Sequence, residues 1–171
     1  MNRPHPTHVP LRWIVAGGWL LSCVGCSDPV TQPFPFSHKV HADHEIDCTA
    51  CHTHPLTQRF SGLPTVQDCL DCHDEPQGES AAEERFIAMA KTLVEECKPL
   101  VWNRLVKVPD HVYYSHRRHV VLGEIPCKRC HGTMGESDKP PKRAPVAITM
   151  DFCIDCHQEK HVDTDCVACH R

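Results

Sequence analysis

The chain has 171 residues, a length typical of one domain, and a formal net charge of −4. It contains 13 cysteines and 15 histidines, whereas aromatic residues make up 6%. Apolar burial is therefore too small for an enzyme built on a large side-chain core. So much Cys and His also excludes an ordinary disordered chain, and the negative charge gives no indication of a nucleic-acid partner. Disulfides, metals or covalent cofactors must organise the fold.

The N-terminus has the features of an export signal. Residues 13–26 read WIVAGGWLLSCVGC and carry no charged side chain, and Arg3 and Arg12 precede them. The stretch is shorter than the roughly 20 residues of a membrane-spanning helix, but it is typical of the apolar part of a signal sequence. This places the body of the protein outside the cytoplasm.

Residues 20–22, Leu-Leu-Ser, stand before Cys23 and resemble a bacterial lipoprotein cleavage box. Residues 1–26 are therefore predicted to be a signal or lipoprotein leader, with Cys23 as the lipid-bearing residue. Cys26 as the lipidated residue, an uncleaved membrane anchor and simple secretion are the alternatives. Residues 27–35 are polar and interrupted by proline, which is typical of a tether.

Ten of the remaining cysteines form five motifs of the type Cys-x-x-Cys-His. A random chain of this composition would contain roughly 0.09 of them. The motifs are Cys48-x-x-Cys51-His52, Cys69-x-x-Cys72-His73, Cys127-x-x-Cys130-His131, Cys153-x-x-Cys156-His157 and Cys166-x-x-Cys169-His170.

This spacing is that of covalent haem c attachment. Two thiols add across the two haem vinyl groups, and the adjacent imidazole binds the iron as the proximal ligand. Zinc sites and disulfides would also use paired cysteines, but neither explains a histidine directly after every second cysteine. The motifs therefore predict five haem c groups.

Eight further histidines follow the leader and exceed the five distal ligands that five haems need: His38, His41, His44, His54, His111, His116, His119 and His161. Phe36-Ser37-His38-Lys39-Val40-His41 precedes the first motif, and Tyr114-Ser115-His116-Arg117-Arg118-His119 precedes the third. Each copy has a second motif downstream. Residues 36–73 and 114–157 are thus predicted to be an internal duplication, and residues 158–171 add a fifth haem.

A helix is predicted between the two copies. Residues 79–98 are rich in Ala and Glu, with Glu83 and Glu84 early in the segment, and Pro99 follows. Phe86, Ala90, Leu93 and Cys97 recur on one helical face. The rest of the domain, residues 36–171, is expected to be mostly irregular with few short α-helices, organised around covalent haems.

An aromatic-Ser-His-x-x-His segment ahead of a haem motif resembles the multihaem cytochrome c3 and c7 group. That resemblance implies that His38 binds the haem of residues 48–52 and His116 that of residues 127–131. It also implies that His41 and His119 bind iron of other haems nearby. His161 and His111 are the candidates for the fifth distal ligand, with His161 preferred for its place just before Cys166.

The order of segments over residues 33–171 resembles the cytochrome subunits of alternative complex III and of the periplasmic quinone reductase complex. The pattern Trp-x6-Pro-Asp-x-Val-Tyr-Tyr of residues 102–114 carries this resemblance most specifically. It implies an electron carrier on the periplasmic side of the inner membrane. An iron–sulfur subunit and a quinone-binding membrane subunit would be its partners.

The resulting hypothesis is a membrane-associated pentahaem cytochrome without catalytic activity. It would pass electrons between a quinol-oxidising or quinone-reducing membrane complex and periplasmic redox partners. A free periplasmic shuttle is one alternative. A multihaem reductase of small nitrogen or sulfur oxyanions is another, and it would need one iron with an open position.

Overall fold

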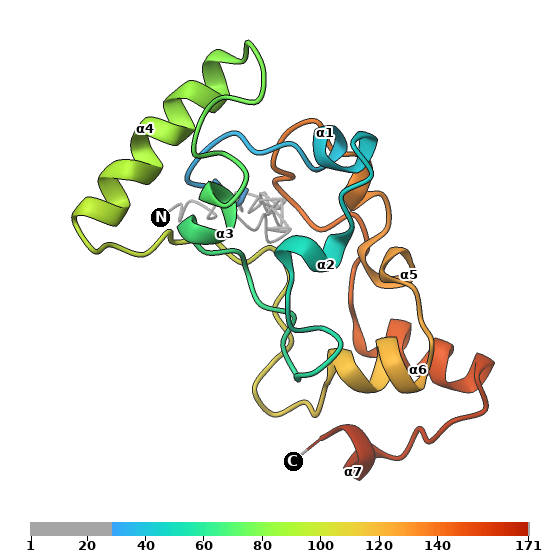
Figure 1. The fold of residues 1–171 in the computed structure, drawn as a ribbon. Coiled ribbons are helices and arrows are strands. Elements are labelled where there is room, and N and C mark those ends of the chain that lie inside the picture. The colour runs from blue at the N-terminus through green and yellow to red at the C-terminus, as the bar shows by residue number, and fades with distance from the viewer. Residues whose placement is uncertain (1–28, 171) are drawn as a thin grey trace, which may run out of the picture.

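The computed structural model describes residues 29–170, so the prediction of lipidation at Cys23 lies outside the described residues. Short helices joined by irregular segments make up this part of the chain (Figure 1), as predicted. In chain order they are α1 (His38–Asp43), α2 (Cys48–Cys51), α3 (Val66–Leu70), α4 (Ala81–Glu95), the π-helix η1 (Arg118–Leu122), α5 (Cys127–His131), the 3-10 helix η2 (Met134–Glu136), α6 (Met150–Glu159) and α7 (Cys166–Cys169). Within residues 29–170 the only β pairing is a single bridge between Val112 and His170. No helix of this part is both long and apolar enough to cross a bilayer.

Each Cys-x-x-Cys-His motif lies in or at the end of a short helix. At α2 the side chain of Asp47 accepts a hydrogen bond from Thr49 N at 2.8 Å. At α3 a capping box joins Thr65 and Asp68, in which each side chain bonds the other residue's backbone N–H. Such caps satisfy the free N–H groups that begin a helix, so these two turns are defined locally.

The predicted linker helix corresponds to α4, which begins after the N-cap residue Ser80 and ends at Glu95. It is shorter at both ends than residues 79–98, and Cys97 lies beyond it with φ of +52°. Phe86, Ile87 and Ala90 are buried on the face that packs against α3. Cys97 is exposed and does not share that face, contrary to the periodicity of the sequence.

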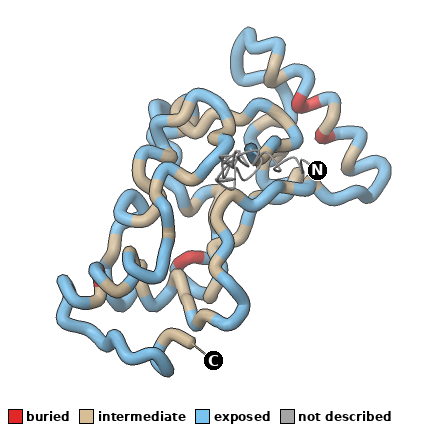
Figure 2. Tube along the Cα trace, turned by 180° about the vertical axis from the view of Figure 1, so that it is seen from behind, coloured by how far each residue is buried: buried red, intermediate tan, exposed pale blue. Residues whose placement is uncertain are grey.

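The side-chain core is very small. Within residues 29–170 the buried residues are Pro55, Phe86, Ile87, Ala90 and Cys156. Figure 2 shows these few buried positions along a chain that is otherwise partly or fully exposed. A domain of this size normally buries many more apolar side chains. The predicted covalent cofactors would therefore have to supply most of the apolar interior between the helices.

The two aromatic-Ser-His-x-x-His segments have matching ring geometry, although the first continues as the α-helix α1 and the second as the π-helix η1. Ring centroids lie 4.8 Å apart for Phe36 and His38, and 4.9 Å apart for Tyr114 and His116. Each aromatic ring also lies 4.7 Å from the second histidine of its segment, at an interplanar angle of 30° in both copies. In both copies this second histidine places Nδ1 2.8 Å from the carbonyl oxygen of the serine.

Each copy is held by the loop that follows the first motif of the other copy. His116 donates its backbone N–H to the carbonyl of Arg59, at 3.0 Å, and Arg117 donates to that of Gln58. Conversely, Lys39 donates its N–H to the carbonyl of Ser137, and the Ser137 hydroxyl lies 3.3 Å from Nδ1 of His38. These exchanged contacts bring the first and third motifs together, although 78 residues lie between Cys48 and Cys127 in sequence.

Candidate haem sites

We number the sites by motif: site 1 (Cys48–His52), site 2 (Cys69–His73), site 3 (Cys127–His131), site 4 (Cys153–His157) and site 5 (Cys166–His170). At four sites a second imidazole faces the motif histidine. The ring centroids lie 6.0 Å apart for His41 and His73, 6.4 Å for His116 and His131, 6.2 Å for His119 and His157, and 5.6 Å for His111 and His170.

The separations of 6.0–6.4 Å at sites 2, 3 and 4 fit an iron between two imidazoles, whereas the rings at site 5, 5.6 Å apart, are closer together. A metal–nitrogen bond of about 2 Å on each side, with about 1.2 Å from nitrogen to ring centre, puts the two centroids about 6.3 Å apart. His116 and His131 are also nearly parallel, at 6°. In residues 29–170 no three His, Cys, Asp or Glu side chains converge as a metal cluster. Paired imidazoles are what a porphyrin needs, because its four nitrogens supply the other ligands.

At site 1 the candidate for the second histidine is His38, which lies close enough to His52 for the two rings to interact electrostatically. Burial lowers the pKa of His38, and the nearby charge of His52 lowers it further. Burial likewise lowers the pKa values of His116 and His131. These rings are therefore neutral at neutral pH, and the neutral imidazole is the form that binds a metal.

At site 5 the ring that faces His170 belongs to His111. An antiparallel bridge from Val112 to His170 and a 2.7 Å hydrogen bond from Tyr113 N to the carbonyl of Cys169 hold the two segments together. His161 is exposed and follows α6 in a left-handed conformation, with φ of +55°. The geometry thus favours His111 over the His161 preferred from sequence proximity, because the chain from 109 to 113 folds back on α7.

Electrostatic interactions between neighbouring thiols link the five sites in a row. Burial raises the pKa of Cys48, and the next cause is the Cys127 thiol, which lies within hydrogen-bonding reach. Burial raises the pKa of Cys69 to about 11, with the neighbouring Cys51 adding to the shift. Sites 2, 1 and 3 are therefore consecutive neighbours in space.

The row continues through the C-terminal half of the chain. Burial raises the pKa of Cys130, and the charges of Cys156 and Cys153 raise it further. Burial raises the pKa of Cys153, and the charge of Cys169 raises it further. Site 3 therefore adjoins site 4, and site 4 adjoins site 5. Figure 1 shows the helices of the row, α3, α2, α5, α6 and α7, following one another across the molecule to the C-terminus.

Hydrogen bonds orient many of the paired rings. Backbone carbonyls lie 2.7–3.1 Å from Nδ1 of His41, His52, His116, His119 and His157. The ring of His73 differs, because its Nδ1 lies 2.6 Å from a carboxylate oxygen of Glu83. Sequence reasoning missed these partners. A carbonyl leaves no side-chain signature, and Glu83 was noted only as an acidic residue of the first helical turn.

Arg59 provides a further sign of a missing anionic group. Its Nη2 donates to the carbonyl of Val112 at 2.7 Å, whereas its buried Nε has no partner among the described residues. A buried guanidinium N–H without an acceptor is costly. The same residue's carbonyl bonds His116 of site 3. A haem propionate at this place would supply the acceptor.

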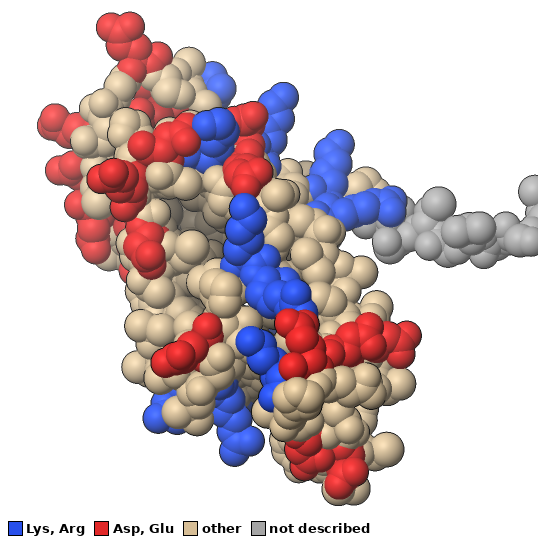
Figure 3. Space-filling model, turned by 90° about the vertical axis from the view of Figure 1, so that its right-hand side faces the viewer, with Lys and Arg blue, Asp and Glu red and all other residues tan. Residues whose placement is uncertain are grey.

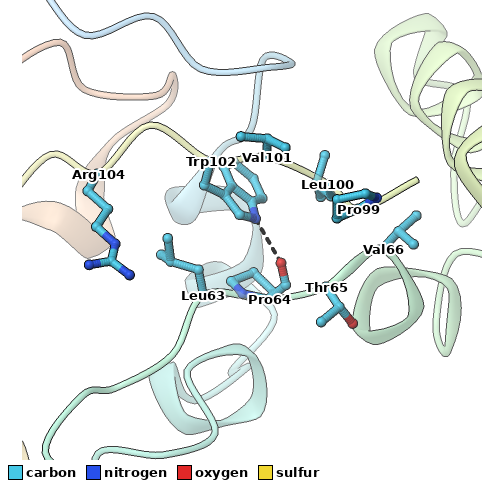
Figure 4. A pocket seen from close by; sticks show the side chains of 9 residues that line it. All are labelled: Leu63, Pro64, Thr65, Val66, Pro99, Leu100, Val101, Trp102 and Arg104. Carbon is cyan, nitrogen blue, oxygen red and sulfur yellow. Dashed lines mark hydrogen bonds between the residues drawn. The ribbon is translucent and has the colours of Figure 1, made fainter. Parts of the chain in front are cut away.

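A cavity lies outside the row. It has a volume of about 410 Å³ and is lined by Leu63, Pro64, Thr65, Val66, Pro99, Leu100, Val101, Trp102 and Arg104. Figure 4 shows these side chains, with the indole N–H of Trp102 donating to the carbonyl of Pro64 at 2.7 Å. None of its residues belongs to a haem motif or to a histidine pair. The cavity is therefore not the place where the predicted chemistry occurs.

The surface charge is unevenly distributed. Figure 3 shows one face on which Lys and Arg side chains form a band between groups of Asp and Glu. Exposed residues of both signs, such as Arg129 and Glu159, also form ion pairs with each other. Mixed charge of this kind suits transient contact with a redox protein better than binding to a polyanion.

Comparisons with known proteins identify related families. The model of the family described as cytochrome c7 and related cytochrome c matches residues 112–171, and that of the class III cytochrome C family matches residues 24–98. The chain is also 32% identical, over 165 residues, to the multihaem cytochrome c subunit of menaquinone reductase from Nitratidesulfovibrio vulgaris. That alignment covers 82% of this chain and 77% of the relative.

The two family matches cover different halves of the chain, with sites 1 and 2 in one and sites 3–5 in the other. Together with the relative, they indicate covalently bound haem c as the cofactor and an electron-transfer protein rather than a catalytic enzyme. The resemblance to the c3 and c7 group is confirmed, and the chain belongs to the multihaem cytochromes c of this type.

Proposed function

We propose that the chain is a pentahaem cytochrome in which every iron has two histidine ligands. The observation that carries this proposal is the pairing of imidazole rings at four sites: His73 with His41, His131 with His116, His157 with His119, and His170 with His111. At site 1 we assign His38, whose pKa is lowered by burial and then by the nearby charge of His52. The ten motif cysteines form the thioethers. The shared geometry around Phe36 and Tyr114 supports an origin of residues 36–73 and 114–157 by duplication.

The function of these residues is to hold and orient the cofactors. Haem supplies reversible one-electron chemistry. Two fixed imidazoles leave no iron position open to a substrate, so each site only accepts and donates electrons. The order 2–1–3–4–5 gives the electron a continuous path, because consecutive sites have thiols close enough to affect one another's pKa.

The tether would place one end of this path close to the membrane. Thr31 and Gln32 bond Asn103, and Phe34 packs on Phe86 of α4, 4.6 Å between ring centroids. The ring of His73 of site 2 lies 6.5 Å from the Phe86 ring, between centroids. A lipid on Cys23 would be within roughly 20 Å of Pro29 even with the intervening residues fully extended. Val30 also donates its backbone N–H to the carbonyl of Lys142, in the loop after site 3. The contacts of the tether therefore lie toward sites 2 and 3 rather than site 5, and we propose site 2 as the membrane-side end of the row and site 5 as the outer end.

The partners follow from this placement and from the relative. That relative is a subunit of a menaquinone reductase. We propose that this chain likewise passes electrons between a quinone-reducing or quinol-oxidising membrane complex and periplasmic redox proteins. An iron–sulfur subunit and a quinone-binding membrane subunit are the proposed neighbours within the complex, on the periplasmic side of the inner membrane.

Two measurements on the purified, tagged protein test this function. The mass of the denatured chain should exceed the apo mass by five haem groups, and the ferric EPR spectrum should contain low-spin signals with no substantial high-spin fraction. A substantial high-spin fraction would instead favour a reductase of nitrogen or sulfur oxyanions.

Fractionation tests the membrane association. The haem protein should sediment with membranes and, after mild detergent, co-purify with an iron–sulfur and a polytopic subunit. Recovery of all haem protein in the detergent-free periplasmic fraction, with no companion subunits, would favour the free shuttle.

A further inference from the structure

The ring of His73 has a carboxylate partner. Its Nδ1 lies 2.6 Å from Oε1 of Glu83, and the two side chains are only 25% and 14% exposed. The contact is thus short and largely sheltered from water. A hydrogen bond between an imidazole and a carboxylate in such a place is stronger than one to a neutral carbonyl.

Glu83 is fixed where it stands by its helix. It lies in the first turn of α4, where the helix dipole favours a negative charge, and its backbone N–H bonds the side chain of the N-cap residue Ser80. The same Oε1 atom accepts the backbone N–H of Gln77 at 2.8 Å. Burial of Phe86 against α3 joins this helix to the element that carries Cys69. The carboxylate and the motif therefore belong to one packed unit.

Sites 1 and 4 offer a direct comparison. There the proximal rings of His52 and His157 place Nδ1 2.9 Å and 2.7 Å from the backbone carbonyls of Gly62 and Asp163. A carboxylate withdraws the ring proton more strongly than a carbonyl does, so it leaves more negative charge on the imidazole. A more basic axial ligand stabilises ferric over ferrous iron.

We propose that Glu83 is a positioning residue that lowers the reduction potential of the site 2 haem below those of sites 1 and 4. This inference rests on the proposed function, because it requires His73 to be an axial ligand. Site 2 gains and loses one electron, and the Nδ1 proton stays between His73 and Glu83 throughout. As the more reducing, membrane-side end of the row, site 2 would give electrons to site 1 with a favourable driving force.

The test is a potentiometric titration of the holoprotein with Glu83→Gln. Glutamine keeps an acceptor oxygen for His73 and Gln77 but removes the charge. One midpoint potential should rise, and the g values of one low-spin EPR component should change. That midpoint should be the one that also rises in His41→Met, since a thioether opposite His73 raises the potential of the same haem.

The matched control is Glu84→Gln, which removes the same charge from an exposed neighbour on α4 and should leave all midpoints in place. Unchanged midpoints in Glu83→Gln, or an equal shift in Glu84→Gln, would overturn the inference. If Glu83→Gln fails to load haem, the wild-type protein decides. The midpoint that shifts in His41→Met identifies the site 2 haem, and the midpoint that shifts in His119→Met identifies the site 4 haem. In the wild-type protein the site 2 midpoint must lie below the site 4 midpoint, and the reverse order refutes the role of Glu83.

Different results would contradict the proposed function and the role of Glu83. A wild-type chain that lacks five low-spin haems would contradict the five-site arrangement, whatever Glu83→Gln does. Five low-spin haems with no effect of Glu83→Gln would leave that arrangement intact and remove only the role of the carboxylate.

Discussion

At the scale of single residues, the ligand opposite His170 determines the spin state of site 5. The structure places His111 there, with ring centroids 5.6 Å apart. We expect His111→Ala to convert about one fifth of the ferric haem to the high-spin form, because one iron of the five loses its second imidazole. EPR and the visible charge-transfer band measure this fraction. His161→Ala serves as the control and should remain fully low-spin, and a high-spin fraction in that variant instead would assign the ligand to His161.

A second residue-scale prediction concerns Arg59. Its buried Nε has no acceptor among the described residues, and its backbone carbonyl bonds His116 of site 3. If a propionate accepts from it, the positive charge stabilises ferrous haem, whose net charge is more negative. Arg59→Gln should then lower one midpoint potential. Arg59→Lys keeps the positive charge and should leave that midpoint potential close to the wild-type value. A titration with Arg85→Gln, an exposed arginine of α4, controls for the general loss of charge, and three identical titrations would exclude the propionate.

These residues also mark the limit of sequence reasoning. The motif histidines and the candidates His38, His41, His116 and His119 followed from spacing and resemblance, and their assignment as ligands stays a prediction. Spacing could not choose between His111 and His161. Nearness in sequence favoured His161, five residues before Cys166. The fold instead brings His111, more than fifty residues away in the chain, next to site 5. Partners such as the Gly62 carbonyl have no side chain to recognise.

At the scale of elements, a tight turn directly follows the motif of site 3. Gly132 follows His131 with φ of +56°, and a Cβ added there would lie 3.0 Å from Cγ2 of Val146 and 3.2 Å from Cβ of Pro145. Gly132→Ala should therefore destabilise the holoprotein by about 1–2 kcal/mol from the backbone alone, and more from the contact. Gly135→Ala, where an added Cβ meets nothing within 4 Å, should change the midpoint of guanidinium unfolding much less. Equal midpoints for the two variants would contradict this reading of Gly132.

Among the elements, local signals were the reliable ones. The helix expected over residues 79–98 exists as α4, since Ser80 caps it and Ala and Glu favour it. Its ends and its buried face differ because Cys97 turns left-handed and because α3 covers Phe86 and Ile87. The exchange of loops between the two copies, through Arg59 and Ser137, joins segments far apart in the chain, and no periodicity indicates it.

At the scale of the whole molecule, the described chain lacks the apolar core that a domain of its length needs. Phe86, Ile87 and Ala90 form its hydrophobic cluster, and large side chains such as Val101 and Leu122 are 67% exposed. Folding must offset a conformational entropy of roughly 1–2 kcal/mol per residue, which a cluster of this size cannot do. Haems attached at ten cysteines would supply both the buried apolar surface and the cross-links that restrict the unfolded chain.

We therefore expect the chain without haem to remain largely unfolded. A variant with all ten motif cysteines replaced by alanine, secreted in the same host, should show weak far-ultraviolet circular dichroism and no cooperative thermal transition. Only α4, with its own caps and length, should retain some helicity in isolation. A variant lacking Cys97 alone controls for the loss of a thiol and should melt like the wild type. A cooperative, native-like melt of the haem-free chain would mean that side-chain packing is sufficient for folding. The haems would then bind to a fold that forms without them.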